Sequence, residues 1–270
     1  SSTTIATWIP HVISSVYYEI KNSYSIRART TDSGGLFIDK AFTITVTDVN
    51  ELPSFNVIQE QQINEDAGPY SVPLTGIASG DDVSQPVRIV ATSSNTSLIP
   101  NPTATYTSPD ATGSIAFTPA ADQHGTATIT VTVEDGGLDG DLATAGDNAT
   151  FSRTFDVVVT PVNDEPTLHT LPALTMAQDS PGQLIRLSGI SAGGGEAQPL
   201  RITASSSNAG LLTQPFVSYL SELGDAERLL AITPALGRYG VTTVYVTVED
   251  GGLDNDLATE ADNASFTQSF

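Results

Sequence analysis

The stretch VTVEDGGLD at Val131–Asp139 recurs letter for letter at Val246–Asp254, an offset of 246 − 131 = 115 residues. Its first half alternates valine with polar residues, which is the two-residue period of a strand with one buried and one solvated face. Its second half is rich in glycine and aspartate, the residues that favour turns. A strand that leads into an acidic turn, present twice in one chain, indicates tandem β-rich units.

The repeat extends outward from this stretch. Asn50-Glu51-Leu52-Pro53 recurs as Asn163-Asp164-Glu165-Pro166, an offset of 163 − 50 = 113, and Gln85–Ile89 recurs at the same offset as Gln198–Ile202. The larger offset after the second strand pattern shows that the last copy gained two residues, because 115 − 113 = 2.

A partial copy precedes the two longer ones. TDSGG at Thr31–Gly35 is followed by the strand-like FTITV at Phe42–Val46, and the later copies carry a ten-residue insertion between the corresponding segments. We therefore expect the C-terminal part of a repeat at 1–50, a complete repeat at 51–163, and a repeat that lacks its last strand at 164–270.

Each copy has the pattern of a β-sandwich. Ile129, Val131 and Val133 alternate with threonines, and Phe155, Val157 and Val159 alternate in the same way. Roughly seven such segments in about 110 residues, with no helical period, are typical of an immunoglobulin-like Greek-key sandwich. The predicted fold is all-β, with tandem sandwiches arranged as an elongated rod.

Composition narrows the functional classes. The chain holds 31 acidic and 10 basic residues, a net charge of −21, and no cysteine. Such a surface repels nucleic acids and anionic membranes and attracts cations. No apolar run approaches the roughly 20 residues of a membrane span. We expect neither nucleic acid nor direct membrane insertion as a partner of this segment.

The junction sequences resemble those of the cadherin repeat. Asp48-Val49-Asn50-Glu51-Leu52-Pro53 is close to the Asp-x-Asn-Asp-x-Pro linker of that family. Weaker matches are Tyr17–Glu19 to its Asp-x-Glu motif, Thr31-Asp32 to its Ala-x-Asp motif, Asn64–Asp66 to its early glutamate, and Asp81-Asp82 to its Asp-x-Asp turn. The second and third copies are more similar to the cadherin-like repeats of very long bacterial surface proteins.

The resemblance implies calcium ions between successive domains. At the first junction the implied ligands are Glu19, Asp48, Asn50, Glu51, Asp81, Asp82 and Asp135; at the second they are Glu65, Asn163, Asp164 and Asp250. We expect the second junction to be weaker, because Pro161 stands in place of Asp48, and Gly194 and Gly195 stand in place of the Asp81-Asp82 pair.

Physical chemistry supports a metal without reference to the family. Two carboxylates about 5 Å apart repel by roughly 3 kcal/mol at an effective dielectric near 20, so several acids gathered at a hinge favour a cation. Oxygen ligands without histidine or cysteine select calcium over zinc. The acidic insertion at 135–147 has two interpretations: it holds its own ion with Asp147, or it is a solvated loop.

These patterns predict a non-enzymatic, calcium-stiffened structural or adhesive segment of a large extracellular, cell-surface or secreted matrix protein. An active site normally occurs once, whereas the acids here recur in each copy. The expected partners are neighbouring repeats of the same polypeptide, and then other surface proteins or copies of itself. The alternatives are a fibre-forming subunit completed by a strand from a neighbouring chain and an accessory module of a secreted polysaccharide-acting enzyme.

Overall fold

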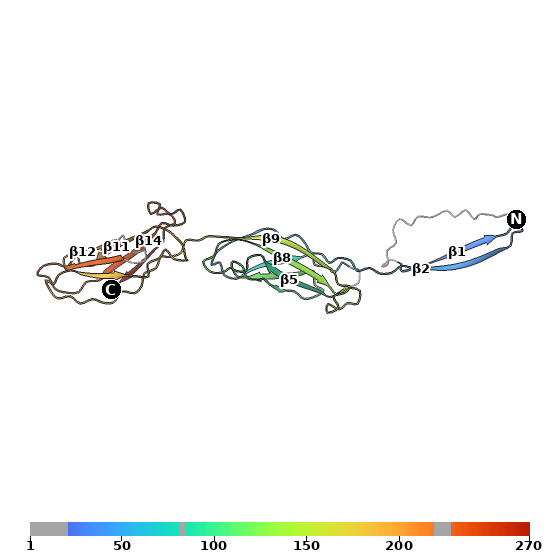
Figure 1. Cartoon of the computed structure of the whole chain (residues 1–270), viewed down its shortest axis with the longest axis horizontal. Coiled ribbons are helices and arrows are strands. Elements are labelled where there is room, and N and C mark those ends of the chain that lie inside the picture. Colours follow the sequence, from blue (N-terminus) through green and yellow to red (C-terminus); the bar gives the residue numbers. More distant parts are fainter. Residues whose placement is uncertain (1–20, 81–84, 219–227) are drawn as a thin grey trace.

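The computed structural model describes residues 21–80, 85–218 and 228–270. Within these ranges every regular element is a strand, and no helix is present (Figure 1). The predicted all-β fold is confirmed. The described part of the chain accordingly holds no helix of the length and apolarity that crossing a membrane requires.

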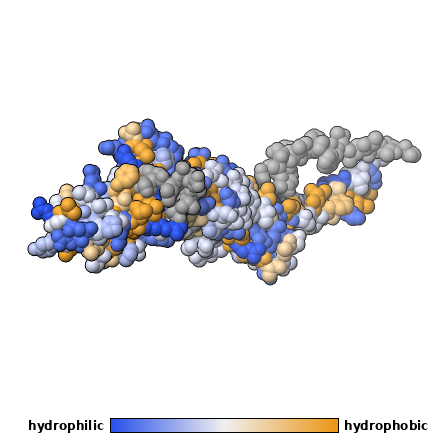
Figure 2. Space-filling model, turned by 60° about the vertical axis from the view of Figure 1, so that its left-hand side comes forward, coloured by the Kyte–Doolittle hydropathy of each residue, from blue (hydrophilic) through white to orange (hydrophobic). Residues whose placement is uncertain are grey.

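The first unit is a hairpin of β1 (Ser23–Thr31) and β2 (Phe37–Thr45), paired antiparallel. Its turn is closed by Asp32, whose Oδ1 accepts hydrogen bonds from the backbone N–H groups of Gly34 and Leu36, both at 2.9 Å. Large apolar side chains lie exposed on the hairpin, and Figure 2 shows them as orange atoms at its surface. The buried hydrophobic clusters of the described residues lie in the other two units.

The central unit is a sandwich of seven strands. One sheet has the order β3-β9-β8-β5 and the other β4-β7-β6, and β3 pairs with β9 in parallel. The strands are β3 (Gln61–Asn64), β4 (Tyr70–Thr75), β5 (Val87–Ser93), β6 (Thr103–Thr105), β7 (Thr112–Phe117), β8 (Gly125–Asp135) and β9 (Thr150–Thr160). This confirms the expected number of strands and their division into two sheets.

The core of the central unit follows the alternation read in the sequence. Ile129, Val131 and Val133 of β8 are fully buried, as is Val157 of β9. Their polar neighbours on the same strands face outward. Burying each such aliphatic side chain contributes about 1.5–3 kcal/mol, so β8 and β9 contribute strongly to the core of the unit.

The third unit repeats this arrangement with fewer strands. One sheet has the order β11-β14-β15 and the other β10-β13-β12. The strands are β10 (Gln183–Leu187), β11 (Leu200–Ser206), β12 (Leu212–Ser218), β13 (Arg228–Pro234), β14 (Val244–Asp250) and β15 (Ser265–Ser269). Among the described residues of the third unit, no strand pairing corresponds to the parallel pairing of β3 with β9. An apolar groove of about 420 Å³ lies there, lined by residues that include Leu174, Met176, Val241 and Phe270.

Strand direction decides which residues meet at each end of a unit. In the central unit β8 and β9 are antiparallel, so the end of β8 at Asp135 lies beside the start of β9 at Thr150 and beside the incoming linker at Asn50. The end of β3 and the turn before β8 lie at the opposite end, beside the linker to the third unit (Figure 1). The expected elongated rod stays a prediction.

Candidate metal sites at the repeat junctions

At the first junction, Asn50 and Asp135 are joined by a hydrogen bond. The Asn50 side-chain Nδ2 donates to Asp135 Oδ1 at 3.0 Å and to the backbone carbonyl of Asp147 at 2.9 Å. The Asn50 Oδ1 in turn accepts from Gln85 Nε2 at 3.1 Å. Asn50 therefore fastens the linker to the acidic loop through its amide nitrogen, and its oxygen is already hydrogen-bonded.

The same arrangement recurs at the second junction. Asn163 Nδ2 donates to Asp250 Oδ1 at 3.0 Å and to the carbonyl of Asp262 at 2.9 Å, and Gln198 Nε2 donates to Asn163 Oδ1 at 2.7 Å. Asn163 is thus the structural equivalent of Asn50. In both units, therefore, the linker asparagine binds the preceding linker to the acidic loop through side-chain hydrogen bonds.

Among the described residues, the remaining ligands expected at the first junction form no cluster of three or more acids. Glu19, Asp81 and Asp82 lie outside the described residues. Asp48 accepts a hydrogen bond from the adjacent Val49 N–H at 3.0 Å, and Glu51 is exposed. The calcium site predicted at this junction, and its greater strength relative to the second, therefore stay predictions.

The second junction gathers acids from both units and from the linker. Oxygen atoms of Glu65, Asp164 and Glu196 lie within 4.8 Å of one another, and so do oxygen atoms of Asp66, Asp122 and Asp164. Asp164 belongs to both groups. Of these, Glu65 and Asp164 were expected; we call the five residues together the junction cluster.

Glu65 is the buried member of the junction cluster, with 4% of its surface exposed. Its Oε1 accepts a hydrogen bond from the backbone N–H of Val162 in the linker at 2.8 Å, and its Oε2 lies 3.6 Å from His124 Nδ1. One carboxylate of the central unit therefore already holds the linker backbone. At an effective dielectric near 20, each ionised pair among Glu65, Asp164 and Glu196 repels by roughly 3.5 kcal/mol or more, because their oxygens lie within 4.8 Å of one another.

Glu196 is oriented by the third unit and by the linker. Its Oε2 accepts from the Asp164 backbone N–H at 3.3 Å and from Gln198 Nε2 at 3.0 Å. Glycine at 194 makes room for this cluster, because a Cβ there would collide with the Asp164 carboxylate. Gly194 carries no carboxylate, but its lack of a side chain leaves space for the carboxylate of the linker residue Asp164.

Asp66 and Asp122 hold strained backbone conformations. Their φ angles are +59° and +54°, in the left-handed region that few residues other than glycine adopt. The corresponding positions of the third unit, at offsets of 113 and 115, are Asp179 and Gly237, with φ of +60° and +71°. The same backbone contact links each pair: Asp122 N–H donates to Asp66 Oδ1 and Gly237 N–H to Asp179 Oδ1.

The junction cluster raises the pKa of two of its acids. The pKa of Asp164 lies above its ordinary value, first because of partial burial and then because of the charges of Asp122, Asp66 and Glu65. The pKa of Glu196 is also raised, again chiefly by burial, with the charges of Asp164 and Glu65 adding to it. The negative charges of the ionised Asp164 and Glu196 are therefore not balanced by nearby positive charge of the described residues or by solvent.

A pH dependence follows for the metal-free chain. Because the folded-state pKa values of Asp164 and Glu196 are raised, the folded state binds protons more tightly there, and stability falls as pH rises through that window. Lowering the pH from about 7 toward the ordinary carboxyl pKa values near 4 should therefore raise the contribution of these two groups to the urea midpoint in the presence of a chelator. Asp164→Asn should flatten this slope. An unchanged slope in that variant would contradict the role given to the cluster.

The sequence comparison covers the central unit. Residues 50–152 match the family model described as the bacterial Ig domain. The central repeat is therefore similar to a bacterial Ig domain. The match extends from Asn50 of the linker to the first residues of β9 and so includes the acidic loop. A comparison with curated protein sequences finds no match.

Several solved structures are similar to the chain at low identity. Domains 4–9 of the surface layer protein SbsC are 13% identical over 92% of this chain, with a TM-score of 0.27; the chain spans 34% of that structure. Domains 3–6 of protocadherin gamma B2 are 18% identical over 94% of this chain and 59% of theirs, with a TM-score of 0.34. The titin domains Z1Z2 are 13% identical over 82% of this chain and 96% of theirs, with a TM-score of 0.31. The Ig-like assignment rests on the strand order and on the family match.

Proposed function

We propose that this chain is a calcium-stiffened, non-catalytic spacer segment of a bacterial surface or matrix protein. Calcium bound by the junction cluster would tie the central unit, the linker and the third unit together. Calcium at the predicted first-junction site would do the same between the first two units. Millimolar calcium outside the cell matches the affinity of extracellular calcium modules, about 10⁻⁴ to 10⁻³ M.

The strongest support for the proposal comes from comparing Asp122 in the central unit with Gly237 at the equivalent position of the third unit. The backbone conformation at Asp122 is one that glycine adopts without strain, and the third unit has Gly237 at the equivalent place. Asp122 is therefore not needed for the turn. It faces Asp66 and Asp164, where a further negative charge is unfavourable unless a cation is bound.

The third unit lacks this acid set at its own far end. Gln178 stands at the position of Glu65, since 65 + 113 = 178, and Gly237 stands at the position of Asp122. The turn is kept while two of the charges are absent. This supports a ligand role for the acids at the second junction, because the fold alone does not require them.

The direct test is a calorimetric calcium titration of the whole chain, with small-angle scattering at each end point. We expect saturable binding near the millimolar range, together with a longer and stiffer particle. Glu65→Gln should weaken binding at the second junction by about tenfold or more, whereas the matched control Glu60→Gln, an exposed glutamate outside the cluster, should not. Glu51→Ala reports on the first junction.

The opposite result is equally definite. If calcium binds without any change in particle length, the ions do not lock the hinges between units, and the stiffening role is wrong. If nothing binds up to about 10 mM, well above the expected range, the chain is a plain sandwich spacer whose acids contribute only solubility.

The apolar groove of the third unit favours a second candidate function. Tyr239 and Val241, which line it, are more than four-fifths exposed, an unusual state for side chains of this size. A strand from a neighbouring chain could occupy the groove and pair there as β9 pairs with β3. The scattering data give particle mass, and a mass that grows with protein concentration would favour such a fibre-forming subunit over the spacer.

A further inference from the structure

The acidic loop of the central unit begins at a fully buried carboxylate. Asp135 has 0% of its surface exposed, and its Oδ1 accepts three hydrogen bonds, from Asn50 Nδ2 at 3.0 Å, Gly137 N at 3.0 Å and Ala149 N at 2.8 Å. Its Oδ2 is buried and has no hydrogen-bond partner among the described residues. A buried carboxylate oxygen without a donor or a cation is strongly unfavourable.

Two further oxygens near it are in the same state. Asp147 Oδ1 and Asn148 Oδ1 are buried and find no donor within the described part of the chain. The Asp147 carboxylate lies against Gly137, where a Cβ would stand 2.6 Å from Asp147 Cγ. Since the Gly137 N–H is bonded to Asp135, both carboxylates lie against the same glycine.

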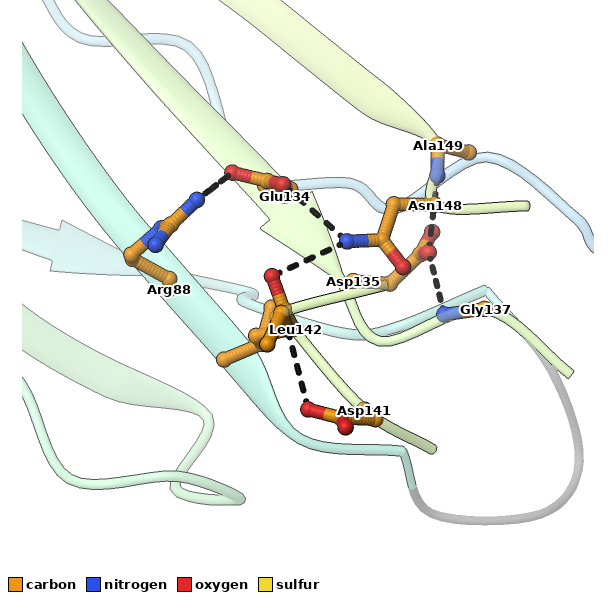
Figure 3. A network of polar contacts seen from close by, with 9 residues as sticks. Arg88, Glu134, Asp135, Gly137, Asp141, Leu142, Asn148 and Ala149 are labelled. Carbon is orange, nitrogen blue, oxygen red and sulfur yellow. Dashed lines mark hydrogen bonds and ion pairs between the residues drawn. The ribbon is translucent and has the colours of Figure 1, made fainter. Parts of the chain in front are cut away.

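The amide of Asn148 has a fixed orientation. Its Nδ2 donates to Glu134 Oε1 at 3.1 Å and to the Leu142 carbonyl at 3.4 Å, so its oxygen points the other way, toward the Asp135 carboxylate (Figure 3). An inverted amide would place its oxygen against two acceptors. Asp135 Oδ2 and Asn148 Oδ1 are therefore two buried oxygens in one loop to which the described residues supply no donor.

The third unit has the same pattern in an independent copy of the loop. Asp250 is fully buried, and its Oδ1 accepts from Asn163 Nδ2, Gly252 N and Ala264 N, while its Oδ2 has no partner in the described ranges. Asn263 Oδ1 likewise lacks a donor there. The Asp262 carboxylate lies against Gly252 as that of Asp147 lies against Gly137.

We propose that the loops 135–149 and 250–264 each bind a calcium ion within their own unit. The ligands in the central loop are Asp135 Oδ2, Asp147 Oδ1 and Asn148 Oδ1, with water completing the shell. Oxygen donors of mixed carboxylate and amide type, with no nitrogen or sulfur, suit calcium. This inference does not depend on the junction cluster, because none of these residues belongs to it, and it assigns Asp135, one of the ligands expected at the first junction, to an ion within its own unit.

The central loop should bind more tightly than its copy. Arg88 directs both of its donor groups to Glu134 Oε2, which leaves Oε1 to hold Asn148. Arg201 instead bonds both oxygens of Glu249. Asn263 is left with no partner on either amide atom within the described residues, so its oxygen is less well positioned for a ligand.

Hydrogen exchange of the whole chain, with and without calcium, tests the proposal. Calcium should slow exchange of the amides in 136–149 and in 251–264, at a lower calcium concentration in the first loop. Asp147→Asn should weaken the calcium effect in 136–149 by about tenfold or more and leave 251–264 unchanged, so that each loop is a control for the other. Asp147→Asn keeps an oxygen that can accept the Asp139 N–H, and is therefore expected to fold.

Two further variants distinguish calcium bound in the loop from calcium bound elsewhere on the chain. Asp141→Asn makes the same charge change on an exposed side chain of the same loop, and should leave the calcium effect intact. Glu65→Gln should leave both loops protected by calcium even if it abolishes binding at the second junction. Exchange in 136–149 that does not respond to calcium, or that responds equally in Asp147→Asn, would overturn the proposal.

Discussion

Replacing Asp135 with alanine is expected to lower the free energy of unfolding of the central unit by about 3–5 kcal/mol. The substitution removes the acceptor of three donors, those of Asn50, Gly137 and Ala149. Each donor left buried without an acceptor costs about 1–3 kcal/mol, and some of this is recovered where water can enter. The linker should loosen together with the loop, because Asn50 joins them.

The measurement is urea unfolding in a chelator, followed by hydrogen exchange in β8 and, as an internal reference, in β14 of the third unit. Asp135→Asn keeps one oxygen for the three donors, so it should cost far less than alanine. Asp139→Ala, which removes only an exposed acceptor of the Asp141 N–H in the same loop, should cost no more than about 1 kcal/mol. A loss below about 1 kcal/mol for Asp135→Ala would show that the loop and linker do not depend on this carboxylate.

The fold could be predicted from the sequence because apolar and polar residues alternate with a two-residue period over long segments. The alternation at Val131–Val133 reports burial directly, and a turn rich in glycine and aspartate must follow it. The strand-like FTITV of the first unit did not lead to a buried face, since its Ile44 is 50% exposed in the described hairpin. A period shows which side chains share a face, but burial needs a second sheet to cover that face.

The sites were harder to predict because they depend on contacts distant in sequence. Asp122 stands in a turn with no repeated motif, and only the fold brings it beside Asp66 and Asp164. Glu196 could not be predicted from the repeat, because Gly194 and Gly195 stand in place of the Asp81-Asp82 pair and the acid comes one residue later. One signal was available: Asp122 corresponds to Gly237, which marks a position where the chain favours glycine.

The role of Asp135 shows a different limit. Its place in the motif suggested a ligand shared across the junction, but the amide nitrogen of Asn50 bonds one of its oxygens. An asparagine can offer either a donor or an acceptor, and the letters of a motif do not say which. The other oxygen of Asp135 remains available to a cation, on the loop side.

Asp122→Gly is expected to change stability in opposite directions with and without calcium. In a chelator, glycine relieves the left-handed strain at φ +54° and removes a charge that raises the pKa of Asp164, so the chain should gain about 1 kcal/mol or more. In about 50 mM calcium, well above the expected dissociation constant, the variant lacks a ligand. A site that is at least tenfold weaker then loses about 1.3 kcal/mol or more of the stabilisation that bound calcium provides.

The matched control is the reverse change at the equivalent position, Gly237→Asp. It introduces the same strain at φ +71°, but Gln178 replaces the buried glutamate there, so calcium should not compensate and the variant should be destabilised in both buffers. The urea midpoint of each variant is compared with that of the unchanged chain, once in chelator and once in calcium. A change of sign only for Asp122→Gly means that this aspartate is kept for a cation; the same sign in both buffers means that its charge has no metal partner.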